Sequence, residues 1–268
     1  MAKLFLVLFI WIAGFSSTAC TPFAFPSDLR RANSFAPLAR ATVGAQSLDL
    51  YLRQRTAVLV GECPGGEMHI SEAVAVDPRG YFVTAAHCLE ATQFHLFYFD
   101  GFHTRVATPR VVAVEADKVH DDFALIHVAG TTRCVFQWAE PGLPGEADVA
   151  VAVGGGPDDP NSKSTLIPPP QCLAGRIVSL EPSGRIALRI LHNLPLRPGD
   201  SGGPLATTNG KLIGINTGVR VSWLGEAVAM AIRPDPRWVR YRIDQDAAAV
   251  QIRETISPAS WTGSLQAR

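Results

Sequence analysis

Short apolar runs rich in β-branched residues follow one another from Thr56 to Ile232 and dominate the chain. Each run has the length of a strand, and turn-favouring residues separate the runs, as in the Asp-Pro-Arg-Gly sequence at 77–80. About a dozen such strands with no long helical pattern predict an all-β fold of two closed antiparallel barrels. The runs lie at residues 57–60, 73–76, 81–84, 94–99, 106–114, 123–128, 149–153, 175–180, 185–190, 212–221 and 227–232.

Two further segments complete the folded part of the chain. Residues 238–253 have apolar spacing suited to one closing helix, whereas the leucines at 48, 50 and 52 fit either a short helix or a strand. A chain of 268 residues, 47% of them hydrophobic, can build one sizeable core. Basic and acidic residues number 24 each, and this zero net charge argues against a nucleic-acid partner.

The N-terminus has the features of a targeting segment. Lys3 precedes an apolar run at 4–13 that is short for a membrane span, and small residues follow as far as Ala19. We expect a signal peptide at 1–19, a proline-containing linker at 20–45, a folded domain at 46–253 and a tail at 254–268. A short membrane anchor that is never cleaved is the alternative to a signal peptide. The segment predicts export to an oxidising compartment.

Cys20 follows this segment directly, in a setting that resembles the lipobox of bacterial lipoproteins. That resemblance implies a lipidated Cys20 as the first residue of the mature chain, tethering the protein to a membrane. Ser17-Thr18-Ala19 equally suits ordinary signal peptidase, which would release a soluble periplasmic or secreted protein. Both alternatives place the protein outside the cytoplasm.

Ser201 lies in the run RPGDSGGPL at residues 197–205, which has a specific chemical use. Its glycines let the backbone turn tightly enough to aim two N–H groups at one point beside the serine oxygen. A serine hydroxyl needs an adjacent base to act as a nucleophile. His87, in the run VTAAHC at 83–88, is a candidate for that base, and Asp121 or Asp122 could hold its other ring nitrogen.

These motifs, in the chain order His, Asp, Ser, resemble those of the trypsin-like (chymotrypsin-fold) serine proteases, and most closely the bacterial branch with the Deg-type proteases. The resemblance covers about 56–232. It implies two six-stranded antiparallel barrels, polypeptide substrates and hydrolysis of peptide bonds through an acyl-enzyme intermediate, without a cofactor. Deg-type proteases usually add PDZ domains, but only about thirty residues follow Ile232, so we expect a bare protease domain.

The resemblance also implies a role for each motif residue. Ser201 would be the nucleophile, and His87 the general base and acid. Asp122 would orient His87, because it directly precedes an apolar strand as the family's aspartate does, and Asp121 would then face solvent. The backbone N–H groups of Gly199 and Ser201 would form the oxyanion hole.

Four positions match the family's specificity pocket: Pro195, Leu196, Thr217 and Val219. Pro195 stands where trypsin carries an aspartate for basic residues, and Asn216 stands where glutamate-specific enzymes carry a histidine. We therefore expect small or medium apolar residues before the cleaved bond. Thr217 also occupies the position of a family Ser or Thr that hydrogen-bonds the triad aspartate.

The cysteines after Cys20 are even in number and allow three pairings. Family members often bridge the cysteine that follows the histidine, which implies a disulfide from Cys88 to its nearest upstream partner, Cys63. That pairing leaves Cys134 for Cys172.

Three other functions are alternatives to an endopeptidase. A metal hydrolase is disfavoured, because the other histidines lack ligand spacing. A catalytically silent binding module would usually lose one triad residue, and this chain keeps all three. An esterase would share the acyl-enzyme chemistry, and ester and peptide substrates would separate the two activities. The other histidines are His69, His95, His103, His120, His127 and His192.

Overall fold

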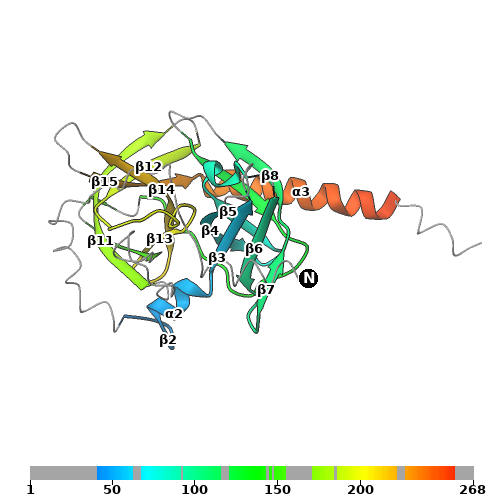
Figure 1. Cartoon of the computed structure of the whole chain (residues 1–268), viewed down its shortest axis with the longest axis horizontal. Helices are drawn as coiled ribbons and strands as arrows, with labels where there is room; N and C mark the ends of the chain where they lie inside the picture. The colour runs from blue at the N-terminus through cyan, green and yellow to red at the C-terminus, as the bar shows by residue number, and fades with distance from the viewer. Residues whose placement is uncertain are drawn as a thin grey trace, which may run out of the picture.

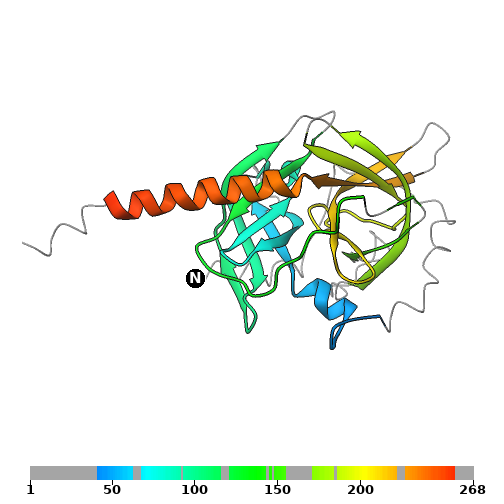
Figure 2. The ribbon, with the colours of Figure 1, turned by 180° about the vertical axis from the view of Figure 1, so that it is seen from behind.

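A computed structural model of the chain (Figure 1) describes residues 41–62, 68–91, 93–115, 121–142, 145–146, 148–154, 171–183, 186–221 and 227–256. The expected signal peptide, Cys20, Cys63 and the expected tail beyond residue 256 lie outside these ranges. Two β-structures lie side by side, and one long helix crosses the first of them (Figures 1 and 2). No helix in these ranges is long and apolar enough to cross a membrane.

The first half of the chain forms a seven-stranded antiparallel sheet in the order β7-β6-β3-β4-β5-β9-β8. The expected strand at 106–114 is divided at Thr108 and Pro109, because proline has no N–H to donate to a ladder. Its two parts are the edge strands, and this short connection makes the sheet curl upon itself. The strands are β3 (Thr56–Glu62), β4 (Met68–Asp77), β5 (Tyr81–Thr84), β6 (Gln93–Phe99), β7 (Thr104–Ala107), β8 (Arg110–Glu115) and β9 (Phe123–His127).

The second half forms a closed six-stranded barrel in the order β10-β11-β12-β15-β14-β13, as expected. Pairing of β10 with β13, as at Ala150 and Thr207, closes the ring. The all-β fold is confirmed, although the first half is a sheet of seven strands with β7 and β8 at its edges, and not the closed six-stranded barrel that we expected. The strands are β10 (Val149–Gly154), β11 (Gln171–Ser183), β12 (Ala187–His192), β13 (Pro204–Thr207), β14 (Leu212–Val221) and β15 (Ala227–Pro234).

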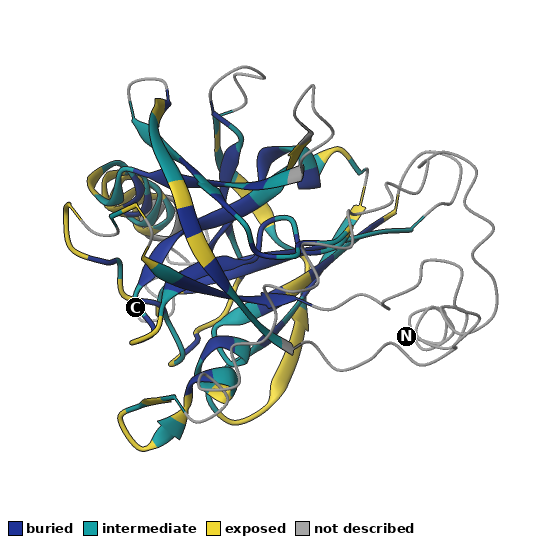
Figure 3. Ribbon diagram, turned by 90° about the vertical axis from the view of Figure 1, so that its left-hand side faces the viewer, coloured by how far each residue is buried: buried dark blue, intermediate teal, exposed yellow. Residues whose placement is uncertain are grey.

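Alternation along the strands builds three cores. In β4, Ala73 and Ala75 face the inside of the first sheet, whereas Val74 faces the core shared by both halves. In β10, Ala152 faces the inside of the barrel and Val151 faces the shared core. Both faces of these strands are therefore buried, which explains why the runs are almost continuously apolar. Figure 3 shows the buried residues concentrated along the strands.

The segment at 47–53 is a helix, α2 (Leu48–Arg53), which settles the alternative left open by its leucines. Leu48 and Leu52 are buried and Leu50 is exposed, as helical spacing requires. The Ser47 hydroxyl caps the helix by accepting the Leu50 N–H. A two-stranded hairpin of β1 (Thr42–Val43) and β2 (Gln46–Ser47) precedes it.

The predicted closing helix is α3 (Pro236–Ile256). The Asp235 carboxylate accepts the Arg237 N–H at 2.8 Å and caps the helix, while Pro236 occupies its first position. Val239 and Ile243 of this helix are buried in the shared core. Figure 2 shows α3 running across the first sheet and past its edge.

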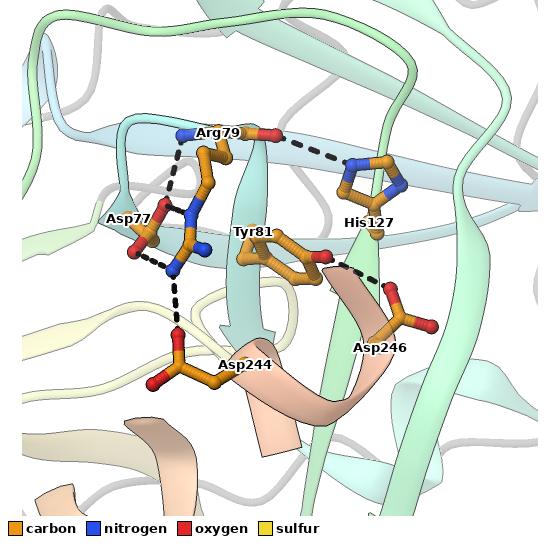
Figure 4. Close-up of polar contacts among 6 residues, drawn as sticks. All are labelled: Asp77, Arg79, Tyr81, His127, Asp244 and Asp246. Atoms are coloured by element: carbon orange, nitrogen blue, oxygen red, sulfur yellow. Dashed lines mark hydrogen bonds and ion pairs between the residues drawn. The ribbon is translucent and has the colours of Figure 1, made fainter. Parts of the chain in front are cut away.

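Polar contacts fasten α3 to the first sheet (Figure 4). The Tyr81 hydroxyl donates to Asp246 Oδ2 at 2.9 Å, and the Arg110 guanidinium pairs with the same carboxylate. A second, more exposed contact joins Arg79 Nη2 to Asp244 Oδ1 at 3.1 Å. The side chain of Asp246 is 16% exposed and that of Asp244 is 60% exposed, so Asp246 makes the stronger attachment.

Asp246→Ala is expected to lower the free energy of unfolding by about 1–3 kcal/mol, because the Tyr81 hydroxyl loses its acceptor. Asp244→Ala, a matched change on the same helix, should cost less than about 1 kcal/mol. The hydrogen bond from Arg110 holds the pKa of Asp246 below its ordinary value. The difference between wild type and Asp246→Ala should therefore shrink as the pH falls below about 4. Urea unfolding of both variants at neutral and acidic pH measures these effects. An equal loss of free energy of unfolding in Asp246→Ala and Asp244→Ala would contradict the stronger attachment at Asp246.

Candidate active site

His87 and Asp122 meet because the strands that carry them pair. His87 lies in the 3-10 helix η3 (Ala86–Leu89) just after β5, and Asp122 lies just before β9. Those strands are antiparallel, with Thr84 opposite Ala124, so the end of one meets the beginning of the other. His87 Nδ1 lies 2.7 Å from Asp122 Oδ2, and the His87 N–H donates to Asp122 Oδ1 at 3.0 Å. The carboxylate thus fixes the ring through Nδ1, and the other ring nitrogen, Nε2, lies 3.7 Å from Cys88 Sγ.

This contact also sets the electrostatics of the pair. The hydrogen bond to the Asp122 carboxylate, supported by the neighbouring Cys88 thiol, raises the pKa of His87. Burial works to raise the pKa of Asp122, but its bonds with His87 outweigh burial and lower that pKa. Asp122 is therefore charged at neutral pH, and it stabilises a protonated imidazole.

The loop that carries Ser201 is a tight turn between β12 and β13. Gly199 and Gly202 adopt positive φ values of 104° and 85°, which favour glycine. Within the loop the Asp200 N–H donates to Arg197 O, and the Gly202 N–H donates to Asn216 O at 2.7 Å. In the described ranges the N–H groups of Gly199 and Ser201 donate to no protein acceptor. Two backbone donors are thus left for a ligand.

Ser201 lies beside His87, and the first sheet holds it there. The Glu72 N–H of β4 donates to Ser201 O at 2.8 Å, a bond between the two halves of the fold. Cys88 Sγ lies 3.7 Å from both Ser201 O and His87 Nε2. In the described part of the chain, however, no hydrogen bond joins Ser201 Oγ to the His87 ring. Catalytic hydrogen bonds of this kind often tighten only when substrate is bound.

Asp200, the carboxylate next to Ser201, is buried at 3% exposure. Its Oδ2 accepts the Arg197 N–H at 2.8 Å. A Cβ atom on Gly154 would lie 2.7 Å from the same oxygen, so the glycine at the end of β10 makes room for the carboxylate. The buried Asp200 carboxylate therefore stabilises the loop by accepting this backbone hydrogen bond.

The four expected specificity residues have different environments. Leu196 is 3% exposed and its side chain belongs to the core of the closed barrel. Pro195 and Thr217 are half-buried, and Val219 is exposed on β14. Among the described residues, no hydrogen bond joins Thr217 to Asp122, so the structure gives this residue no contact with the triad.

Both expected disulfides are wrong, because Cys88, Cys134 and Cys172 are free thiols. Cys88 is buried against His87 and Ser201, and its expected partner, Cys63, lies outside the described residues. Cys134 Sγ faces Gln54 Oε1, whereas Cys172 Sγ faces the backbone oxygen of its neighbour Leu173, so each thiol has a different contact.

The expectation that Asp121 faces solvent is also wrong, since this residue is only 8% exposed. It precedes β9, whose residues Phe123–Ile126 are all buried between β5 and β8, so the chain is already enclosed where the strand begins. Asp122, the neighbour that we preferred, is the one that contacts His87.

Sequence reasoning missed Glu72, and it considered Asn216 only for specificity and not for its bonds to the Ser201 loop. Glu72 is buried at 9% exposure, and Asn216 bonds with its backbone to both Gly202 and Gly203. A single acidic residue inside the apolar run of β4 was the available signal for Glu72. The described residues contain no group of His, Cys, Asp and Glu side chains placed to hold a metal ion.

Cys88→Ala is expected to move the acidic limb of the kcat/KM profile to lower pH. Burial alone would raise the pKa of Cys88, but hydrogen bonds from His69 and His87 outweigh it and lower that pKa to about 7. The thiolate in turn helps to raise the pKa of His87, which must be neutral to accept a proton. Cys134→Ala, at the thiol facing Gln54, is the matched control and should leave the limb in place. An unshifted limb in Cys88→Ala would contradict the coupling.

Comparisons with known proteins agree with this fold. Among solved structures, the HtrA-type protease AlgW with tripeptide has a TM-score of 0.56 and 20% identity, over 72% of this chain and 60% of that chain. The serine endoprotease from Yersinia pestis has a TM-score of 0.54 and 19% identity, over 74% of this chain and 64% of that chain. The chain thus spans less than two thirds of the length of these proteins. No curated protein sequence matches it.

The family-level comparison reaches further than the fold. The model of the trypsin-like peptidase domain matches residues 72–215, which is more than half of the chain. This span begins at Glu72 and includes His87, Asp122 and Ser201. The chain therefore belongs to the family of trypsin-like peptidase domains.

Proposed function

We propose that the protein is an exported serine endopeptidase that cleaves polypeptides with His87, Asp122 and Ser201. The contact between His87 Nδ1 and Asp122 Oδ2 at 2.7 Å, beside the Ser201 loop, carries this proposal. The AlgW structures with tripeptide and with decapeptide support peptides as the substrate class. The backbone N–H groups of Gly199 and Ser201, which have no protein acceptor in the described residues, would form the oxyanion hole.

The reaction follows from these positions. Ser201 Oγ attacks the scissile carbonyl while His87 Nε2 takes its proton, and the Asp122 carboxylate stabilises the imidazolium that forms. The N–H groups of Gly199 and Ser201 donate to the developing oxyanion, where one lost donor typically costs about 10²–10³ in rate. His87 then protonates the leaving amine. Water next attacks the acyl-enzyme while His87 Nε2 takes its proton, and His87 returns that proton to Ser201 Oγ as the carboxylic acid leaves.

Small or medium apolar residues are the proposed preference before the cleaved bond. Pro195, Thr217 and Val219 carry no charge, and the buried side chain of Leu196 adds to the apolar wall of the barrel. Cleavage profiling on a peptide library tests this preference. A profile dominated by Arg, Lys or Glu before the cleaved bond would contradict it.

Export is the second part of the proposal. The apolar run at 4–13 supports a signal peptide at 1–19, followed by a linker. The folded domain is wider than the expected 46–253, because strand β1 begins at Thr42 and helix α3 ends at Ile256, which shortens the expected linker at 20–45 and tail at 254–268. Lipidation of Cys20 would tether the protein to a membrane. Intact-mass analysis of the membrane fraction tests the tether: a diacylglyceryl adduct on Cys20 supports it, and exclusively soluble, unmodified protein contradicts it.

Incubation of the purified protein with an unfolded polypeptide tests the activity itself. Wild type should produce internal cleavages identified by mass spectrometry, and Ser201→Ala should produce none. Ester substrates run in parallel separate a protease from an esterase. Turnover of esters with no peptide cleavage would contradict the endopeptidase assignment.

A further inference from the structure

Glu72 joins the two halves of the fold at the nucleophile. It lies in β4, where its N–H donates to Ser201 O at 2.8 Å and its carbonyl accepts the Thr84 hydroxyl at 2.7 Å. The residue is 9% exposed, so an ionisable side chain is buried directly behind the Ser201 loop. The reaction described above makes no use of this carboxyl group.

The glycines after Ser201 lie directly against Glu72. A Cβ atom on Gly202 would overlap the Glu72 carbonyl oxygen, and one on Gly203 would overlap Glu72 Oε2. The loop therefore rests on this residue without an intervening side chain. The Glu72 carboxyl group therefore lies in close contact with Gly203, two residues after Ser201.

The groups around the carboxyl favour its neutral form. Glu72 Oε2 has no hydrogen-bond partner in the described part of the chain. Asp200 of the loop and the Cys88 thiol of η3 face it, and His69 and His87 lie beyond Cys88 as that thiol's partners. Burial first, then Asp200 and Cys88, raise the pKa of Glu72 well above its ordinary value. A buried charge with no partner would be costly.

We infer that Glu72 is a positioning residue, which in its protonated, neutral form holds the Ser201 loop in place for catalysis. The inference rests on the proposed protease function. Ionisation of Glu72 as the pH rises sets a second negative charge against Asp200 and shifts Gly203. The Ser201 hydroxyl and the oxyanion N–H groups then lose their alignment, so Glu72 sets the alkaline limit of turnover.

The pH dependence of kcat and KM for wild type, Glu72→Gln and Glu72→Ala tests this role. Gln keeps the shape of protonated Glu without its ionisation. It should keep kcat within about threefold of wild type at neutral pH and lack the alkaline limb, along which wild-type kcat falls about tenfold per pH unit. Ala removes the support and should lower kcat at every pH, with KM changed less. An alkaline limb identical in wild type and Glu72→Gln would overturn the inference.

Two further measurements keep the result unambiguous. Cys88→Ala should retain the alkaline limb but move it to lower pH, because the Cys88 thiol helps to raise the pKa of Glu72. The free energy of unfolding of wild type, relative to Glu72→Gln, should decrease as the pH rises above about 4.3, because only the folded wild type keeps the proton. If wild type and Ser201→Ala cleave equally, the protease function itself fails. Cleavage by wild type but not by Ser201→Ala upholds the protease function. If Glu72→Gln then matches wild type in the pH dependence of both kcat and the free energy of unfolding, only the role of Glu72 fails.

Discussion

Ser201→Ala is expected to reduce kcat by about 10⁶-fold, because removing the nucleophile of such a triad leaves only the binding and oxyanion contributions. The change should leave the fold intact. Ser201 is held by its backbone, which bonds to Glu72, and its hydroxyl makes no hydrogen bond in the described part of the chain. Initial rates on a peptide substrate, with thermal unfolding of both proteins, measure the two effects.

A half-buried serine of the closed barrel provides the matched control for this variant. Ser179 lies in β11 opposite Leu191, in the barrel strand pair β11–β12, so Ser179→Ala should keep the wild-type rate within about twofold. Residual cleavage by Ser201→Ala at more than about a hundredth of the wild-type rate would mean that another group attacks the peptide bond. A large drop in melting temperature would instead show that the loss of activity is structural.

Gly202→Ala is expected to reduce activity by at least about 10²-fold and to destabilise the protein. The residue adopts a φ of 85°, which costs an alanine about 1–2 kcal/mol. A Cβ atom there would also overlap Glu72 O and Thr84 Oγ1. Because the carbonyl belongs to the central strand β4, it cannot move away as a flexible side chain could, and the loop must shift. A displaced oxyanion donor alone costs about 10²–10³ in rate.

Gly142 separates the two causes in this prediction. It has the same φ of 85°, but nothing lies within 4 Å of the position of its Cβ atom. Gly142→Ala therefore carries the backbone strain without the overlap, and should show near-normal turnover with a small loss of stability. Rate measurements and urea unfolding of both variants provide the comparison. Near-normal turnover by Gly202→Ala would contradict the close packing of the loop on β4.

The sequence predicted the strands and the contact between His87 and Asp122, because each depends on local pattern. Apolar runs marked nearly all strands, and the strand after Asp122 identified the correct partner of His87. The split of one run at Pro109 shows where that pattern was insufficient, because a single missing N–H divided an otherwise continuous strand. Strand pairing then carried His87 to Asp122 as the motif order implied.

The wrong disulfide prediction and the missed residue Glu72 both concern contacts between residues far apart in the chain. Cys88 lies against the backbone of Ser201, and Glu72 lies under Gly203, in both cases across the junction of the two halves. Neither contact has a local signature. The disulfide at the position of Cys88 in many family members therefore led to a wrong disulfide prediction. Glu72, the acidic residue in β4, gave no indication in the sequence that it lies under Gly203. Such positions can be inferred only once the register of both halves is known.

Labelling of the purified protein with a fluorophosphonate, followed by peptide mapping, tests the catalytic assignment most directly. This reagent forms a covalent bond with a serine hydroxyl that a neighbouring base activates. One adduct per chain is expected, on the peptide that contains Ser201, and labelling should disappear in His87→Ala. An adduct on a different residue, or cleavage of peptides by a protein that takes up no label at Ser201, would contradict the assignment.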